Sequence, residues 1–217
     1  MNINEQIQIS ELVLAVTEKF GFALAGGFAL NVQGIIERPT KDIDTFTSDF
    51  DEVNFRKARE GAEQKLKDAG YIVTVKLDES WRCSMLVTNP TTKDSVELEL
   101  AYYHRYKEVA LVEGIGPVLD VYDLAAGKIV ALWDRQFARD YIDVAAFIAK
   151  GIYSIQDLYD MLKEARPEAS LNEFLACLLQ VNQWHKRYAE YEMSESEIDD
   201  LVKIFHDAAS SLGAATQ

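Results

Sequence analysis

Asp42 and Asp44, two aspartates one residue apart, are the side chains of this chain best suited to chemistry. They lie in the run from Lys41 to Thr47, which reads as a β-strand. Side chains two positions apart on a strand face the same side, so the two carboxylates point together while Ile43 points into the core. Carboxylates this close resist ionising together unless a cation neutralises them. A divalent metal that accompanies a nucleoside triphosphate would supply that cation, so the pair predicts a metal-dependent phosphate site.

A pair of glycines precedes the aspartates. Gly26 and Gly27 follow a short apolar segment, residues 22–25, and open a predicted helix at residues 28–35. Glycine lets the backbone approach a phosphate closely, and the N–H groups at the start of a helix point toward anions. Thr40 and Lys41 stand directly before the acids. We therefore predict that these four residues, Gly26, Gly27, Thr40 and Lys41, bind the nucleotide.

A third carboxylate is expected from a later strand. Glu97 and Glu99 alternate with apolar residues in the predicted strand 95–103, so both face one side of it. A two-metal site for phosphoryl transfer commonly uses a further acid that acts on the nucleophile. Glu99 is the preferred candidate, both for this role and as a third metal ligand beside Asp42 and Asp44, because it lies deeper in the strand and aromatic residues follow it. Glu97 remains the alternative, and a solvent-facing edge strand would give either glutamate no role.

A cationic stripe is predicted in the second half of the chain. At 100° per residue, Lys128, Arg135, Arg139 and Asp143 would share one narrow sector if their helix were continuous. Arginine can make forked contacts to a triphosphate and lysine supplies a point charge. The alternative is a set of surface ion pairs between neighbouring turns, for example Arg139 with Asp143.

The elements that must position these residues change in character along the chain. Helical and strand patterns alternate in the first half, which indicates an α+β fold with a small mixed sheet and flanking helices. Beyond Pro117 only helical patterns remain, so we expect a core at residues 1–117 and a helical domain at 118–217. The predicted helices cover residues 4–20, 28–35, 51–69, 121–137, 139–149, 155–163, 171–187 and 194–212. The predicted strands cover residues 22–25, 41–47, 71–76, 81–88 and 95–103.

Composition restricts the partners and the compartment. The formal net charge of −14 repels nucleic acid and anionic membranes, so a nucleotide needs a local basic patch. The absence of a long apolar run and of a signal peptide predicts a cytoplasmic protein without a membrane span. Cys83 and Cys177 are too few and too far apart for a disulfide framework or a zinc site, and we expect two reduced, buried thiols.

The motifs together resemble those of the nucleotidyltransferase superfamily with a DNA polymerase β-like core. The resemblance is closer to the AbiEii/AbiGii abortive-infection toxin family, and it covers roughly residues 20–150. The residues that carry it are Gly26-Gly27-Phe-Ala-Leu30, Arg38-Pro-Thr40-Lys41-Asp42-Ile43-Asp44, and the helical text with Lys128, Arg135, Arg139, Asp140 and Asp143. One departure is that the third acid is a glutamate here, where the family more often has an aspartate.

The resemblance implies a sheet core followed by a helical domain, with the nucleotide between them. It implies a Mg²⁺-dependent transfer of a nucleotidyl group from a nucleoside triphosphate, such as ATP, to an acceptor hydroxyl. It also implies a toxin that a partner antitoxin neutralises. The implied roles are phosphate binding for Gly26 and Gly27, metal binding for Asp42 and Asp44, triphosphate binding for Lys128, Arg135 and Arg139, and either positioning of the basic side chains or direct action for Asp140 and Asp143.

The acceptor and the activity itself stay open at the level of sequence. The acidic charge and the lack of a basic tract weaken an RNA acceptor, so a protein or a small molecule is also considered. Two other functions compete with the enzyme. One is a nucleotide-binding protein that has lost transfer activity, and the other is an interaction protein whose acidic surface docks a basic partner.

Overall fold

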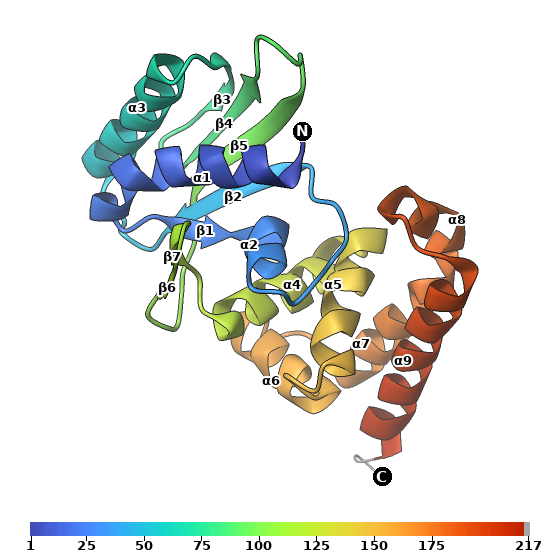
Figure 1. The fold of residues 1–217 in the computed structure, drawn as a ribbon. Coiled ribbons are helices and arrows are strands. Elements are labelled where there is room, and N and C mark those ends of the chain that lie inside the picture. Colours follow the sequence, from blue (N-terminus) through green and yellow to red (C-terminus); the bar gives the residue numbers. More distant parts are fainter. Residues whose placement is uncertain (215–217) are drawn as a thin grey trace. The chain divides into compact units, whose positions relative to one another are not determined.

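The computed structural model describes residues 1–214, which divide into two compact units (Figure 1). The first, here called the sheet unit, comprises Met1–Val32 and Thr40–Leu124. The second, here called the helical unit, comprises Gln33–Pro39 and the chain from Ala125 onward. The helical unit is therefore discontinuous in sequence, because a seven-residue segment from the first half of the chain belongs to it.

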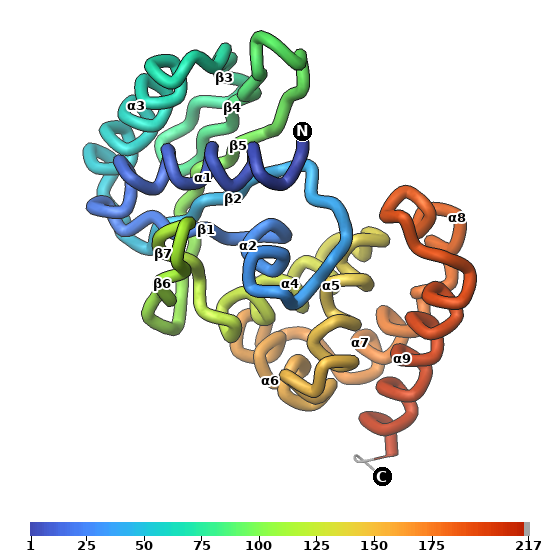
Figure 2. Tube along the Cα trace, viewed as in Figure 1, coloured from blue at the N-terminus to red at the C-terminus, as the bar shows by residue number. Residues whose placement is uncertain are grey.

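The sheet unit contains a seven-stranded mixed sheet with the strand order β3-β4-β5-β2-β1-β7-β6. The strands are β1 (Ala23–Ala25), β2 (Asp42–Thr47), β3 (Ile72–Asp78), β4 (Arg82–Thr88), β5 (Ser95–Tyr102), β6 (Ala110–Val112) and β7 (Gly116–Val118). Strands β3, β4 and β5 form an antiparallel meander, whose course is visible in Figure 2. Strand β2 lies at the centre, antiparallel to β1 and parallel to β5.

Three helices of the sheet unit precede the meander in sequence. Helices α1 (Ile3–Thr17) and α3 (Glu52–Asp68) lie side by side on one face of the sheet (Figure 1). Both begin at a side-chain cap, since Asn2 and Asp51 accept hydrogen bonds from backbone N–H groups three residues on. The short helix α2 (Gly26–Val32) packs on β1 and β2 and starts directly where β1 ends. Its first turn is thereby held against the central strand.

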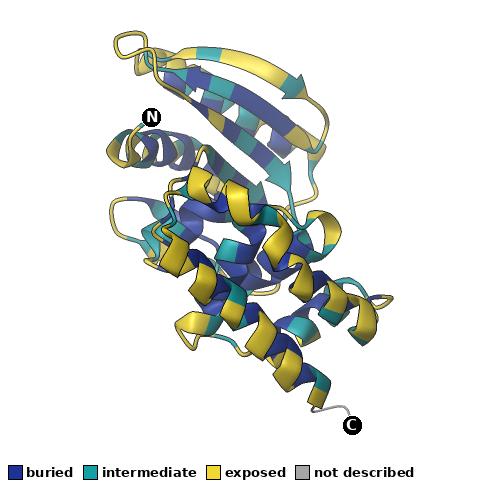
Figure 3. Cartoon of the chain, turned by 90° about the vertical axis from the view of Figure 1, so that its right-hand side faces the viewer, coloured by how far each residue is buried: buried dark blue, intermediate teal, exposed yellow. Residues whose placement is uncertain are grey.

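Helix α4 (Val121–Arg135) begins in the sheet unit and continues into the helical unit. The remaining elements of the helical unit are α5 (Ala138–Ala149), α6 (Ile155–Ala165), α7 (Leu171–Leu179), two short 3₁₀ turns (Gln180–Trp184 and Ala189–Tyr191), α8 (His185–Tyr188) and α9 (Glu195–Ala214). Their inner faces are buried and their outer faces exposed, as the bands of colour in Figure 3 show.

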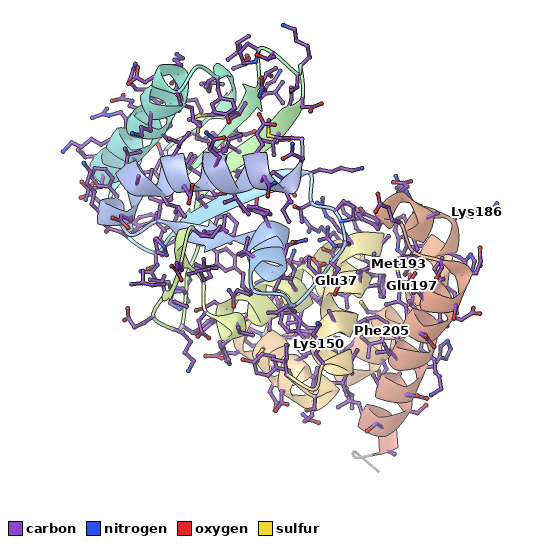
Figure 4. All side chains as sticks on the ribbon, in the orientation of Figure 1. Glu37, Lys150, Lys186, Met193, Glu197 and Phe205 are labelled. Carbon is purple, nitrogen blue, oxygen red and sulfur yellow. The ribbon has the colours of Figure 1, made fainter. Side chains whose placement is uncertain are left out.

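The core of the helical unit is rich in buried aromatic rings. Phe205 of α9, labelled in Figure 4, contacts Tyr141 of α5 edge to face, with ring centroids 5.2 Å apart. The Tyr141 hydroxyl donates a hydrogen bond of 2.8 Å to the carbonyl oxygen of Cys177, so the ring fills the core without an unsatisfied polar group. Burial raises the pKa of the Cys177 thiol to about 12 and that of Cys83 to about 11. Both cysteines are free and buried, as expected, and both stay protonated thiols at neutral pH.

The α+β architecture and most predicted elements are confirmed, with boundaries that differ by a few residues. Two local predictions were wrong. The sequence patterns missed β6 and β7, which are three residues each and lack a clear alternation. The predicted helix 171–187 ends at Leu179 and continues as 3₁₀ turns. Within residues 1–214, no helix is both long enough and apolar enough to cross a membrane.

Candidate active site

The double glycine lies against the second aspartate. Ala25, the last residue of β1, pairs in register with Asp44 of β2, so the turn after Ala25 passes beside the Asp44 side chain. Gly26 has a φ of +64°, in the left-handed region that favours glycine. A Cβ atom at Gly26 would lie 1.8 Å from Asp44 Oδ2, far inside van der Waals contact. Position 26 therefore requires glycine for two reasons, its backbone angle and the carboxylate that fills the space beside it.

The four strand acids share one face of the sheet. Because β2 and β5 run parallel, Asp42 lies opposite Glu97 and Asp44 opposite Glu99. Ile43, between the aspartates, is fully buried, whereas Asp42, Asp44 and Glu99 are half-buried and Glu97 is exposed. The alternation predicted for both strands is thus present, and it places the glutamates on the strand beside the aspartates.

Partners on β4 hold both glutamates. The Arg82 guanidinium donates to Glu99 Oε2 over 2.7 Å, and the Ser84 hydroxyl donates to Glu97 Oε1 over 2.5 Å. Among residues 1–214, no group of three or more histidine, cysteine, aspartate or glutamate side chains is arranged to hold a metal ion. The glutamate side chains therefore do not complete a three-carboxylate cluster with Asp42 and Asp44 in this conformation.

The aspartate pair nevertheless has the chemistry of a magnesium site. Mg²⁺ prefers hard oxygen ligands and is often bound through one or two carboxylates together with substrate phosphates. Asp42 and Asp44 supply two such carboxylates on one face of a strand, and the side-chain-free backbone at Gly26 adjoins Asp44. These residues fit a metal that arrives with a triphosphate, and the fit does not require a third protein ligand.

The two residues before the aspartates differ in their surroundings. Thr40 is buried, and its hydroxyl donates to Gln6 Oε1 over 3.0 Å. Its carbonyl oxygen accepts a hydrogen bond of 2.9 Å from Gln6 Nε2. These bonds hold the entry of β2 against α1, which is a positioning role. Lys41 is exposed.

In the helical unit, Asp143 is bound by two cations. Arg38 Nε and Nη2 donate to the two carboxylate oxygens over 2.7 and 2.8 Å, and Lys128 Nζ lies 2.7 Å from Oδ2. The Asp143 side chain is completely buried. Burial alone would raise its pKa, but Lys128 and Arg38 outweigh that effect and hold the pKa of Asp143 below its ordinary value. The group of Arg38, Lys128 and Asp143 therefore has a formal charge of +1, which suits it to bind an anion.

A second carboxylate of the helical unit binds Arg135. Arg135 donates from Nε and Nη2 to the two oxygens of Asp140, over 3.0 and 2.8 Å. Asp140 also accepts from the backbone N–H of Phe137, which fixes the start of α5. Asp140 and Asp143 thus each orient basic side chains. Sequence patterns alone did not reveal that Arg38, 105 positions before Asp143, is a partner in this group; its only signal was its place within the motif.

The continuous helical stripe is corrected by the structure. Helix α4 ends at Arg135 and α5 begins at Ala138, with a left-handed φ of +53° at Gln136 between them. Lys128 and Arg135 consequently bind different carboxylates, Asp143 and Asp140. Arg139 lies over the Phe137 ring at 5.9 Å and lines a pocket of the helical unit, so it does not extend a row from Lys128.

Two solved structures share this fold. One is JHP933 from Helicobacter pylori, with a TM-score of 0.56 and 19% sequence identity, covering 98% of this chain and 93% of that one. The other is a second Helicobacter pylori protein, provisionally described as a nucleotidyltransferase, with a TM-score of 0.58 and 20% identity, covering 99% and 96%. At such identities the likeness shows the fold. None of the curated sequences compared with the chain matches it.

The sequence itself gives a stronger assignment. Residues 14–213 match the family described as nucleotidyl transferase AbiEii toxin, of the type IV toxin–antitoxin systems. The match spans both units, and it includes the glycine pair, the strand aspartates and the carboxylates that hold the basic side chains. The chain belongs to the AbiEii nucleotidyltransferase toxin family.

Proposed function

We propose that this protein transfers a nucleotidyl group from a nucleoside triphosphate to an acceptor hydroxyl, with Mg²⁺ held by Asp42 and Asp44. The observation that supports this most directly is the contact between Gly26 and Asp44. A backbone without a side chain adjoins a carboxylate that is paired with a second one on the same strand face. This combination suits an ion shared between protein carboxylates and phosphate oxygens.

The proposed reaction is a substitution at the α-phosphorus. The acceptor oxygen forms a bond to this phosphorus, the bond to the bridging oxygen of the β-phosphate breaks, and pyrophosphate leaves. The hydroxyl proton passes to a base, for which Glu99 is the preferred candidate and Glu97 the alternative. Bound Mg²⁺ would neutralise charge that develops on the phosphate oxygens. The backbone at Gly26 and Gly27 would let the phosphates approach closely. Lys41, directly before the aspartates in sequence, would also bind the nucleotide.

The basic residues of the helical unit are proposed to bind triphosphate. Lys128, Arg135 and Arg139 supply the cations, and Asp140 and Asp143 orient them through the ion pairs described above. Thr40 is proposed to act indirectly, by fixing the entry of β2. Family membership also supports a toxin that acts with a partner antitoxin, and the acceptor is an RNA, a protein or a small molecule.

Labelled triphosphates test the reaction. The protein is incubated with Mg²⁺, cell extract or purified RNA, and each of the four triphosphates labelled at either the α- or the γ-phosphate. Nucleotidyl transfer labels the acceptor only from the α-phosphate, whereas phosphoryl transfer would label it from the γ-phosphate. Labelling from the γ-position, or none with any triphosphate, contradicts the proposal.

A matched pair of variants connects the reaction to the site. Asp44→Asn removes a proposed metal ligand and should lower transfer at least about a hundredfold, since metal stabilisation of the transition state amounts to several kcal/mol. Asp94→Asn removes the same charge from an exposed turn of the sheet unit and should leave transfer unchanged. Calorimetry with triphosphate and Mg²⁺ tests the alternative function. A protein that binds nucleotide but has lost transfer activity would bind triphosphate in calorimetry and label no acceptor. Full transfer by Asp44→Asn would exclude the proposed mechanism.

A further inference from the structure

The helical unit contains a pocket that is both aromatic and cationic. Its volume is about 190 Å³. The residues that line it are Phe137, Ala138, Arg139, Trp184, Arg187 and Tyr191. They come from the start of α5 and from the 3₁₀ and α8 segment that follows α7, all within one unit. Three of the six side chains are aromatic and two are arginines, a concentration of positive charge in a chain whose net charge is −14.

The arginines lie over the aromatic rings. Arg139 and Arg135 stand 5.9 and 5.4 Å from the centroid of Phe137, and Arg187 stands 5.7 Å from that of Trp184. The Phe137 and Trp184 rings themselves lie edge to face at 6.3 Å. Such stacking holds guanidinium groups beside the rings. Phe137 is 45% exposed, so its ring remains accessible for a ligand.

Two acids pair with arginines in or beside the pocket. Asp140 is bound by Arg135, and Glu190 lies 3.2 Å from Arg187 on the exposed surface. Exposed pairs of the latter kind are weak, so Arg187 can exchange Glu190 for a stronger anion at little cost. A dianionic phosphate is such an anion, and arginine binds it in a forked geometry.

We propose that this pocket binds a nucleotide, with its base stacked among Trp184, Phe137 and Tyr191 and its phosphate held by Arg139 and Arg187. A cavity of about 150 Å³ holds a benzene molecule, so a pocket of about 190 Å³ suits one planar base rather than a whole nucleotide. Aromatic platforms beside arginines are the usual means of binding single-stranded nucleic acid. The ligand is therefore a free nucleotide or a nucleotide unit of RNA. The inference rests on the proposed function at Arg139, which is also proposed to bind triphosphate, whereas Trp184 and Arg187 belong to the pocket alone.

Binding is measured on the full chain in EDTA, which removes any contribution from a metal site. Calorimetry uses AMP, ribose 5-phosphate and inorganic phosphate, and fluorescence anisotropy uses a labelled five-nucleotide RNA. AMP should bind and quench tryptophan fluorescence, whereas phosphate and ribose 5-phosphate should bind more weakly because they lack a base. If AMP binds, a free nucleotide is sufficient as the ligand of the pocket. If the RNA binds and AMP does not, the ligand is a nucleotide unit of RNA.

Matched variants locate the binding. Trp184→Leu should weaken it roughly five- to a hundredfold, the range expected for loss of one stacked base, and should remove the quenching while Trp81 and Trp133 remain. Arg187→Gln, at an exposed position that does not threaten folding, should also weaken it. Lys186→Gln removes the same charge from the adjacent exposed residue, labelled in Figure 4, which does not line the pocket, and should have no effect.

Several outcomes would overturn the proposal. These are the absence of binding by both AMP and the RNA at millimolar concentrations, equal affinity for AMP and inorganic phosphate, and wild-type affinity in both Trp184→Leu and Arg187→Gln. Asp44→Asn separates this inference from the proposed reaction. That variant should lose transfer but bind AMP in EDTA like the wild type, so failure of either idea is seen independently.

Discussion

The carboxylate of Asp44 fills the space that a side chain at residue 26 would need. The Oδ2 atom lies 1.8 Å from the position of a Cβ at Gly26, and strand pairing between Ala25 and Asp44 fixes that approach. The turn and the acid are therefore one structural feature, although Gly26 and Asp44 are 18 positions apart in the sequence.

Replacing Gly26 by alanine should displace the Asp44 carboxylate. We expect transfer to fall by about a hundredfold or more, because a misplacement of about 1 Å in a reactive group can cost that much. The measurement is the initial rate of labelling from α-labelled triphosphate. Gly34→Ala is the matched control, because Gly34 has a similar φ of +69° but nothing within 4 Å of its Cβ position. Equal activity in the two variants would show that the contact with Asp44 is unimportant.

Glu99→Gln and Glu97→Gln should separate the two candidate bases. If Glu99 accepts the proton, its replacement lowers kcat by about 10²–10⁴, the usual range for general base catalysis, while Glu97→Gln stays close to wild type. Arg82→Gln removes the ion pair between Arg82 and Glu99 but keeps the Glu99 carboxylate. Because an exposed pair contributes about 0–1 kcal/mol, Arg82→Gln should be active. A loss in Arg82→Gln as large as in Glu99→Gln would assign the effect to the ion pair.

Asp143→Asn should destabilise the protein in a pH-dependent way. Breaking a buried ion pair by removing one partner costs about 3–5 kcal/mol. Since the folded state holds the pKa of Asp143 below its ordinary value of 3.8, the stabilisation is fully present above that value and is lost as pH falls through the lower folded pKa. Urea unfolding should give a constant difference between wild type and variant from pH 8 to pH 5, narrowing only below about pH 4. A difference that already narrows between pH 7 and pH 5 would contradict this assignment.

Gln136→Gly should stabilise the junction between α4 and α5. Gln136 has a φ of +53°, and a left-handed conformation costs a non-glycine residue about 1–2 kcal/mol. Glycine removes this strain but loses more entropy on folding, so we expect a net gain of up to about 1 kcal/mol and a rise in Tm of roughly 2–4 °C. Gln136→Ala keeps the strain and should show no rise. Differential scanning calorimetry measures both, and a lower Tm for Gln136→Gly would show that its side chain has an unrecognised contact.

Local patterns predicted the elements that carry the candidate site, and failed where the cause lies far away in sequence. The alternation around Ile43 and the glycine pair predicted β2 and the turn into α2, because burial and backbone freedom act on neighbouring residues. The parallel pairing of β2 with β5 was not predicted, since register between distant strands is not written in either segment. The ion pair between Arg38 and Asp143 was missed for the same reason, because it depends on how the chain folds back.

The break at Gln136 shows how a local rule misled the prediction of a common cationic face. A helical projection from Lys128 assumes constant rotation, and a single left-handed residue ends that rotation. The resulting turn sends Lys128 and Arg135 to different carboxylates.

The discontinuous make-up of the helical unit affects how this protein can be divided. Arg38 reaches Asp143 from residues 33–39, so a fragment that starts after residue 117 would contain a buried carboxylate with only Lys128 beside it. Expressing the helices alone would thus need that short peptide supplied separately or fused at a new end. Exchange of the C-terminal half between relatives by a single genetic crossover would likewise carry Asp143 without its arginine.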